Sequence, residues 1–169
     1  MAARSLPWQA GLRSAARRLA MVLRLLYLRH VRGHAIGANC IVSFKANIDR
    51  TNPRGVHIGE DTGIAFGAVI LAHDFPFNRL VDTRIGARCL IGAHAIIGPG
   101  VTVGDGTIVA PGAVVLSSLP ANCVAVGNPA RVVERGIRAG RWGVRIDRLP
   151  ADRIDPRAVP EGYAWEPAE

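Results

Sequence analysis

The chain has 169 residues, of which 49% are apolar and only 5% aromatic, and its formal net charge is +8. This length suits one domain, whose core must be built from many small aliphatic side chains. The positive charge is concentrated in residues 1–35, which hold seven Arg and no acid, whereas residues 36–135 hold eight basic and seven acidic side chains. A nucleic-acid-binding domain needs a basic stripe on its folded surface, so this balance argues against nucleic acid as a partner.

Residues 5–30 predict a basic amphipathic helix. Arginines interrupt it every few residues, which argues against a secretory signal and against a segment that spans a bilayer. Two interpretations remain open: the helix packs on the end of the following domain or between subunits, or it lies on an anionic membrane surface. At about 100° per residue, six apolar side chains gather on one side of it: Leu12, Ala15, Leu19, Val22, Leu23 and Leu26.

A six-residue repeat occupies the middle of the chain, from Ile36 to about Pro120. A small or short residue stands four positions after most of the aliphatic ones, and Gly often follows them directly. Extra residues interrupt the repeat twice, within Asp49–His57 and at Pro76–Arg84. The aliphatic positions are Ile36, Val42, Ile48, Ile58, Ile64, Ile70, Ile85, Ile91, Ile97, Val103, Val109 and Val115.

A period of six predicts a three-sided coil. Side chains of a strand alternate with period two, so the aliphatic and the small residue both face inward. The Gly after the aliphatic residue is expected to permit a sharp bend. Three such units close a triangle, and successive triangles stack at the strand spacing of about 4.8 Å. Four coils are expected at residues 36–53, 58–75, 85–102 and 103–120, with a partial fifth and a cap at each end.

Three cysteines bear on the cellular compartment. Their number is odd and they form no CxxC motif, and Cys40 and Cys89 both occupy the small position of the repeat. They are therefore expected to be small buried hydrophobes of a protein in a reducing compartment, which favours the cytoplasm.

The run from Ile85 to Val115, with a closing Gly-Asn-Pro-Ala-Arg at residues 127–131, resembles the hexapeptide-repeat acyltransferases. More narrowly, it resembles galactoside, maltose and serine O-acetyltransferases and polysaccharide-modifying relatives. The resemblance covers about residues 36–135 and implies an all-β, left-handed parallel β-helix of about four to five coils. Residues 1–35 would be a helical arm, and residues 136–169 a partly irregular C-terminal extension.

The same resemblance implies a function. It implies a homotrimer with active sites between subunits, acetyl-CoA as co-substrate, no metal, and a sugar or saccharide precursor whose hydroxyl accepts the acetyl group. A lipid-linked saccharide would suit a helix of residues 5–30 that meets the inner face of a membrane. Two alternatives remain: a non-catalytic scaffold, and a carbonic-anhydrase-like metalloenzyme, although the closely spaced final His pair of such enzymes is absent.

His73 is the candidate general base. It stands on the outward side of the third face, directly before the Pro76–Arg84 insertion, and Gly100 of a later coil should leave space above it. A histidine can take up a proton at neutral pH. The resemblance implies that this one removes the proton from the acceptor hydroxyl. The alternative is a solvated histidine on a loop.

Two further residues are weaker catalytic candidates. Asp74 occupies an inward position, where an unpaired carboxylate is costly. Either the coil loses its register there, or a partner holds Asp74, which would then orient a histidine. Asn47 matches a polar Asn that the family often has near its active centre. His94 has the same outward parity as His73 but lies one corner away, and is expected at the surface or at an interface.

The resemblance places acetyl-CoA along a groove near the C-terminal coils, where the matching positions are Ala93, Ala110 and Gly112. Arg131 of the closing motif suits a phosphate. The sequence departs from the family at two points: Leu90 replaces a common Trp, and no basic residue follows Val115 directly.

Overall fold

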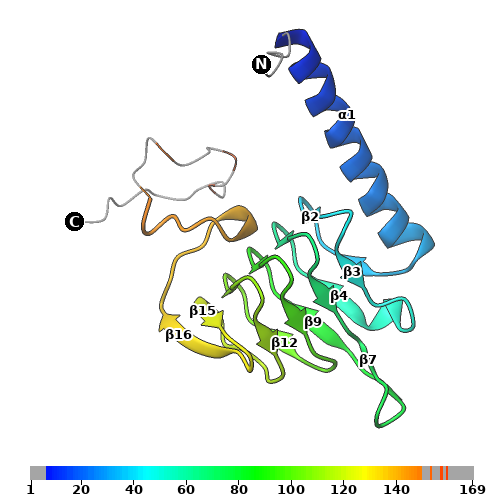
Figure 1. The fold of residues 1–169 in the computed structure, drawn as a ribbon, viewed down its shortest axis with the longest axis vertical. Coiled ribbons are helices and arrows are strands. Elements are labelled where there is room, and N and C mark those ends of the chain that lie inside the picture. Colours follow the sequence, from blue (N-terminus) through cyan, green and yellow to red (C-terminus); the bar gives the residue numbers. More distant parts are fainter. Residues whose placement is uncertain (1–6, 150–152, 154–156, 158, 160–169) are drawn as a thin grey trace, which may run out of the picture.

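A computed structural model, which describes residues 7–149, 153, 157 and 159, shows a prism of stacked coils with three sheets as its faces (Figure 1). The first sheet has the order β1 (Ala35–Ile36), β4 (Val56–Ile58), β9 (Thr83–Ile85), β12 (Thr102–Val103). The second has the order β2 (Ile41–Val42), β5 (Gly63–Ile64), β10 (Leu90–Ile91), β13 (Ile108–Val109), β15 (Cys123–Val126), β16 (Arg131–Arg135). The third has the order β3 (Asn47–Ile48), β6 (Val69–Ile70), β11 (Ile96–Ile97), β14 (Val114–Val115).

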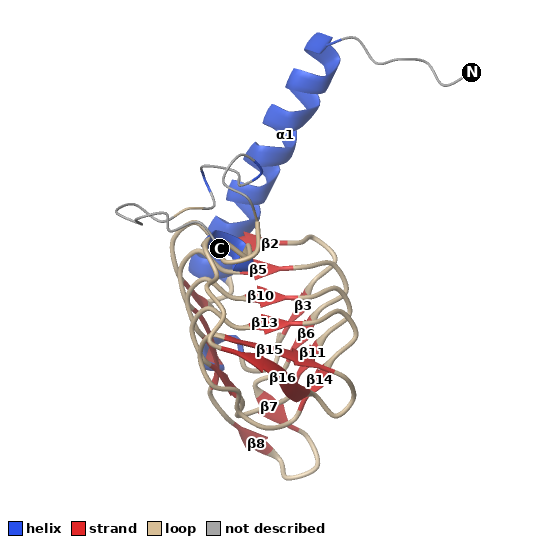
Figure 2. Ribbon diagram, turned by 90° about the vertical axis from the view of Figure 1, so that its left-hand side faces the viewer, coloured by secondary structure: helices blue, strands red, loops and turns tan. Residues whose placement is uncertain are grey.

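The strand register follows the six-residue repeat and confirms the predicted coils. In the third sheet Ile48 pairs with Ile70, Ile70 with Ile97, and Ile97 with Val115. The second sheet, seen as a ladder in Figure 2, continues into β15, which pairs in parallel with β13 as the partial fifth coil, and ends on the antiparallel β16. The aliphatic residues form one continuous buried core, in which all three cysteines are buried and free.

The glycines that follow the aliphatic residues have a different role from the one expected. A Cβ at Gly92 would lie 2.5 Å from the nitrogen of Pro111 in the next coil, and the backbone of Gly92 does not have positive φ. These glycines therefore allow coils to approach closely. The bend occurs two residues later, where the backbone is left-handed, as at Gly112 (φ +71°) and His94 (φ +58°).

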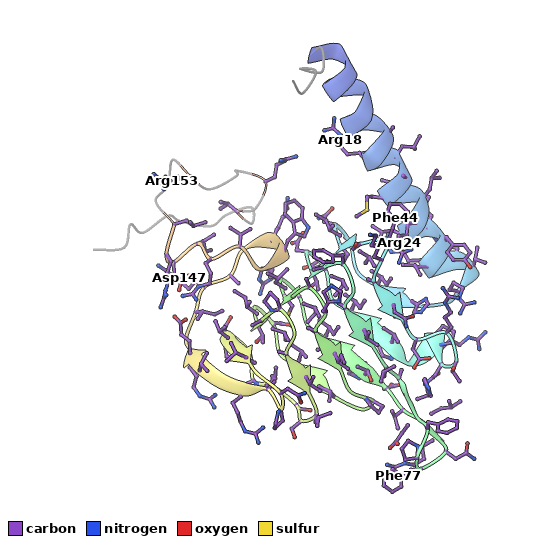
Figure 3. All side chains as sticks on the ribbon, in the orientation of Figure 1. Arg18, Arg24, Phe44, Phe77, Asp147 and Arg153 are labelled. Atoms are coloured by element: carbon purple, nitrogen blue, oxygen red, sulfur yellow. The ribbon has the colours of Figure 1, made fainter. Side chains whose placement is uncertain are left out.

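The coil opens at one corner of the prism, between the third and the first sheet, which we call the His73 corner. Residues 49–55 leave the first coil there and end in a 3₁₀ turn, Pro53–Gly55. In the second coil the chain forms an antiparallel hairpin of β7 (His73–Asp74) and β8 (Arg79–Leu80). The side chain of Phe77 is exposed at the tip, on the opposite side of the prism from α1 (Figure 3).

The N-terminal helix α1 (Pro7–Leu26) continues into a π-helical turn, Tyr27–Val31, and projects from the first coil. Leu28 is buried, Arg24 donates to the carbonyl of Ala46, and Arg29 donates to the carbonyls of Ile36 and Gly37. No helix in the described part of the chain is long and apolar enough to cross a bilayer. Four side chains of the predicted apolar stripe are exposed: Leu19, Val22, Leu23 and Leu26. Two of them, Val22 and Leu26, line a cavity that also includes Ile41 of the first coil.

Residues 137–149 run back along the prism to the first coil. Ile137, Ala139 and Ile146 are buried, and a 3₁₀ turn, Arg141–Gly143, places the indole N–H of Trp142 2.7 Å from the carbonyl of Asn39. This part of the expected extension is thus packed on the coils. The rest of this extension lies largely outside the described residues.

Candidate active site

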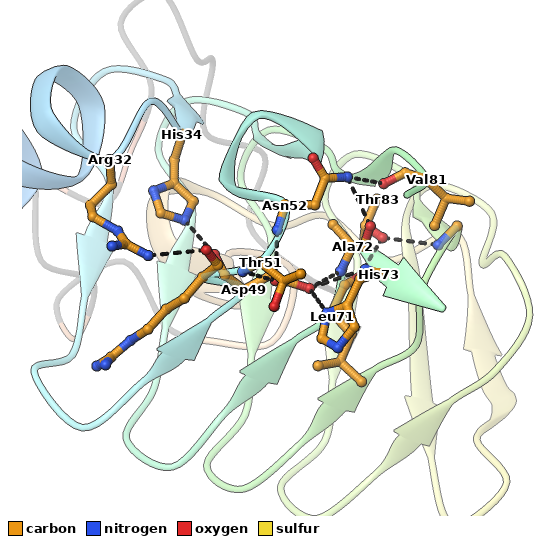
Figure 4. Close-up of polar contacts among 12 residues, drawn as sticks. Arg32, His34, Asp49, Thr51, Asn52, Leu71, Ala72, His73, Val81 and Thr83 are labelled. Atoms are coloured by element: carbon orange, nitrogen blue, oxygen red, sulfur yellow. Dashed lines mark hydrogen bonds and ion pairs between the residues drawn. The ribbon is translucent and has the colours of Figure 1, made fainter. Parts of the chain in front are cut away.

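The side chain of Asp49 is the centre of the His73 corner (Figure 4). It is fully buried, and it follows Ile48 at the point where the first coil opens. One carboxylate oxygen, Oδ1, accepts the N–H groups of Thr51 at 2.7 Å and Asn52 at 3.0 Å. The other, Oδ2, accepts those of Ala72 at 2.7 Å and His73 at 3.0 Å. Asp49 therefore connects the first insertion to the segment that leads into the second one.

The ring of His73 contacts the same carboxylate. Its Nδ1 lies 2.5 Å from Asp49 Oδ2, and its side chain is 29% exposed while that of Asp49 is 0% exposed. Because an ionised carboxylate only accepts hydrogen bonds, Nδ1 carries the proton and Nε2 carries the lone pair. Nε2 makes no hydrogen bond to another residue of the described chain. The ring is thus held in the tautomer that can accept a proton.

The pKa of Asp49 shows that its ionised form is favoured. Burial alone would raise this pKa, but hydrogen bonds from the Ala72 amide, the His73 ring and the amides of Asn52 and Thr51 together lower it to about 2. The carboxylate is therefore ionised at neutral pH, and it can only accept hydrogen bonds from its neighbours.

Two polar side chains hold the opened loops in place. Asn52 Nδ2 donates to the carbonyls of Ala72 at 2.9 Å and Val81 at 3.1 Å. The buried Thr83 hydroxyl donates to Leu71 O at 2.6 Å and accepts the amide of Gly100 at 3.0 Å. These bonds compensate backbone groups that the opening of the coil leaves without ladder partners.

Asp74 and Asn47 lie away from this pair of side chains. Asp74 leaves the coil in the β7–β8 hairpin, and Arg79 binds its carboxylate at 2.9 Å, so both parts of the expectation, lost register and a partner, are met. The residue that orients His73, however, is Asp49. Asn47 is exposed in β3 and pairs with Val69, four residues before His73. Gly100 has open space beside it, since a Cβ there would meet only a Val81 methyl at 3.8 Å.

The positions expected to bind the cofactor lie elsewhere on the prism. Gly112 N donates to Ala93 O, and Ala110 N donates to Ala125 O, so these two amides are used between coils. The amide of Ala93 donates to no residue in the described ranges. Arg131 is exposed on β16, and its guanidinium reaches only the carbonyl of Ala130 among the described residues.

The described residues contain no group of three or more His, Cys, Asp or Glu side chains arranged to hold a metal ion. A cavity of about 900 Å³ lies between α1 and the 3₁₀ turn of residues 141–143, and its lining includes Met21, Leu25 and Trp142 but neither His73 nor Asp49.

Comparisons with known proteins agree with the fold. The family model for the bacterial transferase hexapeptide (six repeats) matches residues 82–117. A search of curated proteins found no match. A solved maltose O-acetyltransferase from Clostridium difficile 630 has 27% identity and a TM-score of 0.52, over 64% of this chain and 72% of that chain. The polySia-specific acetyltransferase NeuO has 27% identity and a TM-score of 0.52, over 63% of this chain and 49% of that chain.

A solved hexapeptide-repeat-containing acetyltransferase from Vibrio cholerae has 22% identity and a TM-score of 0.52, over 78% of this chain and 94% of that chain. At this identity the similarity concerns the fold alone. The protein is therefore a left-handed parallel β-helix. It carries the hexapeptide repeat of bacterial transferases, and the resemblance to the hexapeptide-repeat acyltransferases that the sequence indicated is confirmed.

Proposed function

We propose that this chain is an acyltransferase that moves an acetyl group from acetyl-CoA to a hydroxyl of a sugar or saccharide precursor. The observation that carries the proposal is the contact of His73 Nδ1 with the buried, ionised carboxylate of Asp49. This contact leaves Nε2 as the ring nitrogen that can act as a base. Similarity to acetyltransferases that include a maltose O-acetyltransferase supports this reaction class.

In the proposed reaction His73 Nε2 takes the proton of the acceptor hydroxyl as its oxygen attacks the thioester carbonyl. The charge of Asp49 stabilises the imidazolium that forms. When the tetrahedral intermediate collapses, the C–S bond breaks, and His73 gives its proton to the departing thiolate. The products are an acetyl ester and free coenzyme A, and His73 returns to its initial state.

We further propose that the chain forms a homotrimer with its sites between subunits, as in the family that it resembles. In such an assembly the coenzyme would lie near Ala93, Ala110 and Gly112, with Arg131 as a phosphate contact, and the exposed β7–β8 hairpin would shape the choice of acceptor. A solution mass three times the chain's 18.0 kDa is expected by light scattering. A monomeric mass would contradict shared sites.

The central test combines a screen of saccharide acceptors with acetyl-CoA, monitored by release of free thiol, and two substitutions. We expect His73→Ala to lower kcat by about 10²–10⁴-fold, the usual contribution of a positioned base. Asp49→Asn should also lower kcat, because its amide cannot favour the imidazolium as a carboxylate does. Neither substitution should abolish binding of coenzyme A measured by calorimetry.

His30→Ala is a matched control, because His30 is an exposed histidine on the π-helical turn, outside the His73 corner. It should retain the activity of the unmodified protein. Near-normal acetyl transfer by His73→Ala would remove the proposed base. Failure of the unmodified chain to bind coenzyme A would instead favour a scaffold without catalytic activity.

A further inference from the structure

A polar cavity of about 160 Å³ opens between the end of the N-terminal helix and the first coil. Three arginines from three segments converge on it: Arg24 from α1, Arg32 from the chain after the π-helical turn, and Arg50 from the first insertion. Tyr27, His34 and Asn47 also line it, and no carboxylate does. The cavity therefore gathers positive charge without a counter-charge in its lining.

The arginine side chains are only partly satisfied within the protein. Arg24 Nη2 donates to Ala46 O at 3.2 Å, and its guanidinium lies 5.3 Å from the centre of the Phe44 ring, but its buried Nε has no hydrogen-bond partner in the described chain. Burial and the positive charge of Arg50 lower the pKa of Arg24. Arg32 donates to the backbone carbonyl of Arg50 at 3.3 Å (Figure 4).

The guanidinium of Arg50 makes no hydrogen bond to a described residue. The carboxylate of the adjacent Asp49 accepts its hydrogen bonds from the amides and the ring at the His73 corner, and makes no hydrogen bond or ion pair with Arg50 among the described residues. Arg50 thus presents a full charge and unused donors beside Arg24. Like charges that line one cavity repel, and a bound anion would relieve the repulsion.

His34 adds a polar wall to the same cavity. It is buried, with Nδ1 3.2 Å from Leu28 O and Nε2 3.0 Å from Asp49 O. Both ring nitrogens thus contact backbone carbonyls, one of which belongs to Asp49. The cavity is therefore joined through the backbone of Asp49 to the His73 corner.

We propose that this cavity binds a phosphoryl group, with the guanidinium groups of Arg24, Arg32 and Arg50 as its ligands. Guanidinium groups match phosphate oxygens through paired N–H donors, and charge-assisted bonds of this kind are the strong ones. The volume admits one phosphoryl group but not a whole coenzyme, so this site is separate from the proposed acetyl-CoA site. A dianion would neutralise the positive charge of a cavity whose described lining contains no carboxylate.

Two sources supply such a group. One is a soluble phosphate ester. The other is the headgroup of an anionic phospholipid, in a membrane on whose surface the exposed apolar side chains of α1 would rest. The chemistry recognised is the same in both cases, so the probes must separate the sources.

The first arm of the test titrates inorganic phosphate against the full chain and follows thermal unfolding, with sodium chloride of equal ionic strength as reference. A ligand that binds only the folded state raises Tm once its concentration exceeds Kd, and Tm then continues to rise with the logarithm of the concentration. We expect this response from the unmodified protein. Arg50→Gln should weaken the apparent affinity by about tenfold or more, since it removes a charged hydrogen-bonding partner.

Arg54→Gln is the matched control, because Arg54 is an exposed arginine of the same insertion that does not line the cavity. It should respond to phosphate as the unmodified protein does. Arg32→Gln should behave like Arg50→Gln, so that the result does not depend on one variant. His73→Ala should still bind phosphate, which separates failure of this site from failure of the proposed catalysis.

The second arm measures cosedimentation with phosphatidylcholine vesicles with and without phosphatidylglycerol. Weaker binding of Arg50→Gln than of Arg54→Gln to the anionic vesicles supports a lipid source. Equal binding of the two variants, together with a phosphate-specific rise in Tm that Arg50→Gln weakens, supports a soluble source. The proposal is overturned if neither probe distinguishes the two variants, or if the unmodified protein shows neither a phosphate-specific rise in Tm nor binding to anionic vesicles.

Discussion

Two corners of the prism place a histidine three positions after a buried aliphatic residue, and they use it in opposite ways. His94 follows Ile91 at a regular corner, where its amide donates to Phe66 O and its ring packs edge-on against Phe66, with centroids 5.3 Å apart. His73 follows Ile70 where the coil opens, and its ring and amide both bind Asp49.

The difference lies in the backbone. In a regular coil the amides donate to carbonyls of the neighbouring coil, as Leu71 N does to Ile97 O, so few groups remain for a ligand or a side chain. After Leu71 this ladder stops, and the next two amides turn to the carboxylate of Asp49. The insertions thus supply the donors that keep Asp49 buried and ionised. A polar pair of this kind requires an interruption of the repeat.

Asp49→Asn should disrupt the hydrogen bonds of the His73 corner. We expect it to lower the stability of the fold more than substitutions at the regular corner of His94. The pKa of Asp49 in the folded state is about 2, below its usual value of 3.8. A lowered pKa means that the ionised carboxylate stabilises the fold above about pH 4, and that this contribution, about 2 kcal/mol, is lost as pH falls toward 2. The free energy of unfolding from urea titrations between pH 7 and pH 2 measures it. The variant should be less stable at pH 7, and its difference from the unmodified protein should shrink toward pH 2.

Asp105→Asn is the matched control for this experiment. Asp105 is exposed and accepts the amide of Ala87 at 2.8 Å, but it is not enclosed by a second loop. Its replacement should change the pH dependence much less. If the stability of Asp49→Asn and that of the unmodified protein fall in parallel from pH 5 to pH 2, then Asp49 does not supply the acid-sensitive stability.

The periodicity of the sequence was sufficient to predict the coils in register. Ile48, Ile70, Ile97 and Val115 stack as expected, because a buried aliphatic residue every six positions leaves one alignment that keeps every coil filled. The place of His73 before the second insertion could also be predicted. The role of the glycines could not, because close approach between coils is a property of the stacked structure rather than of one coil.

The partner of His73 was missed because it is 24 residues away and begins the other insertion. One signal was available in the repeat. Ile48 and Ile70 are equivalent positions of adjacent coils, and the chain leaves the regular coil shortly after each of them. Both insertions must therefore leave the prism at the same corner. The Asp-Arg-Thr-Asn run is also typical of a carboxylate that accepts nearby amides in a turn. Asp74 drew attention instead because it is adjacent to His73 in sequence, but the hairpin directs its side chain to Arg79.

The regular corner offers the smallest predicted effect and a direct test of its geometry. His94 has φ +58°, a conformation that costs a residue with a Cβ about 1 kcal/mol or more, and Gly67 and Gly112 occupy the equivalent places in the adjacent coils. His94→Ala keeps this cost and loses the contact with Phe66, whereas His94→Gly loses the contact but relieves the strain. Since glycine also costs about 0.5–1 kcal/mol in chain entropy, we expect the Gly variant to be the more stable by only about 0.5–1 kcal/mol in urea unfolding.

Gly67→Ala provides the reverse control, because it adds the strain and places a Cβ 2.4 Å from the His94 ring, so it should destabilise. A more stable Ala than Gly variant at position 94 would mean that the left-handed backbone at this corner is not strained, and that the two corners differ only in their side chains.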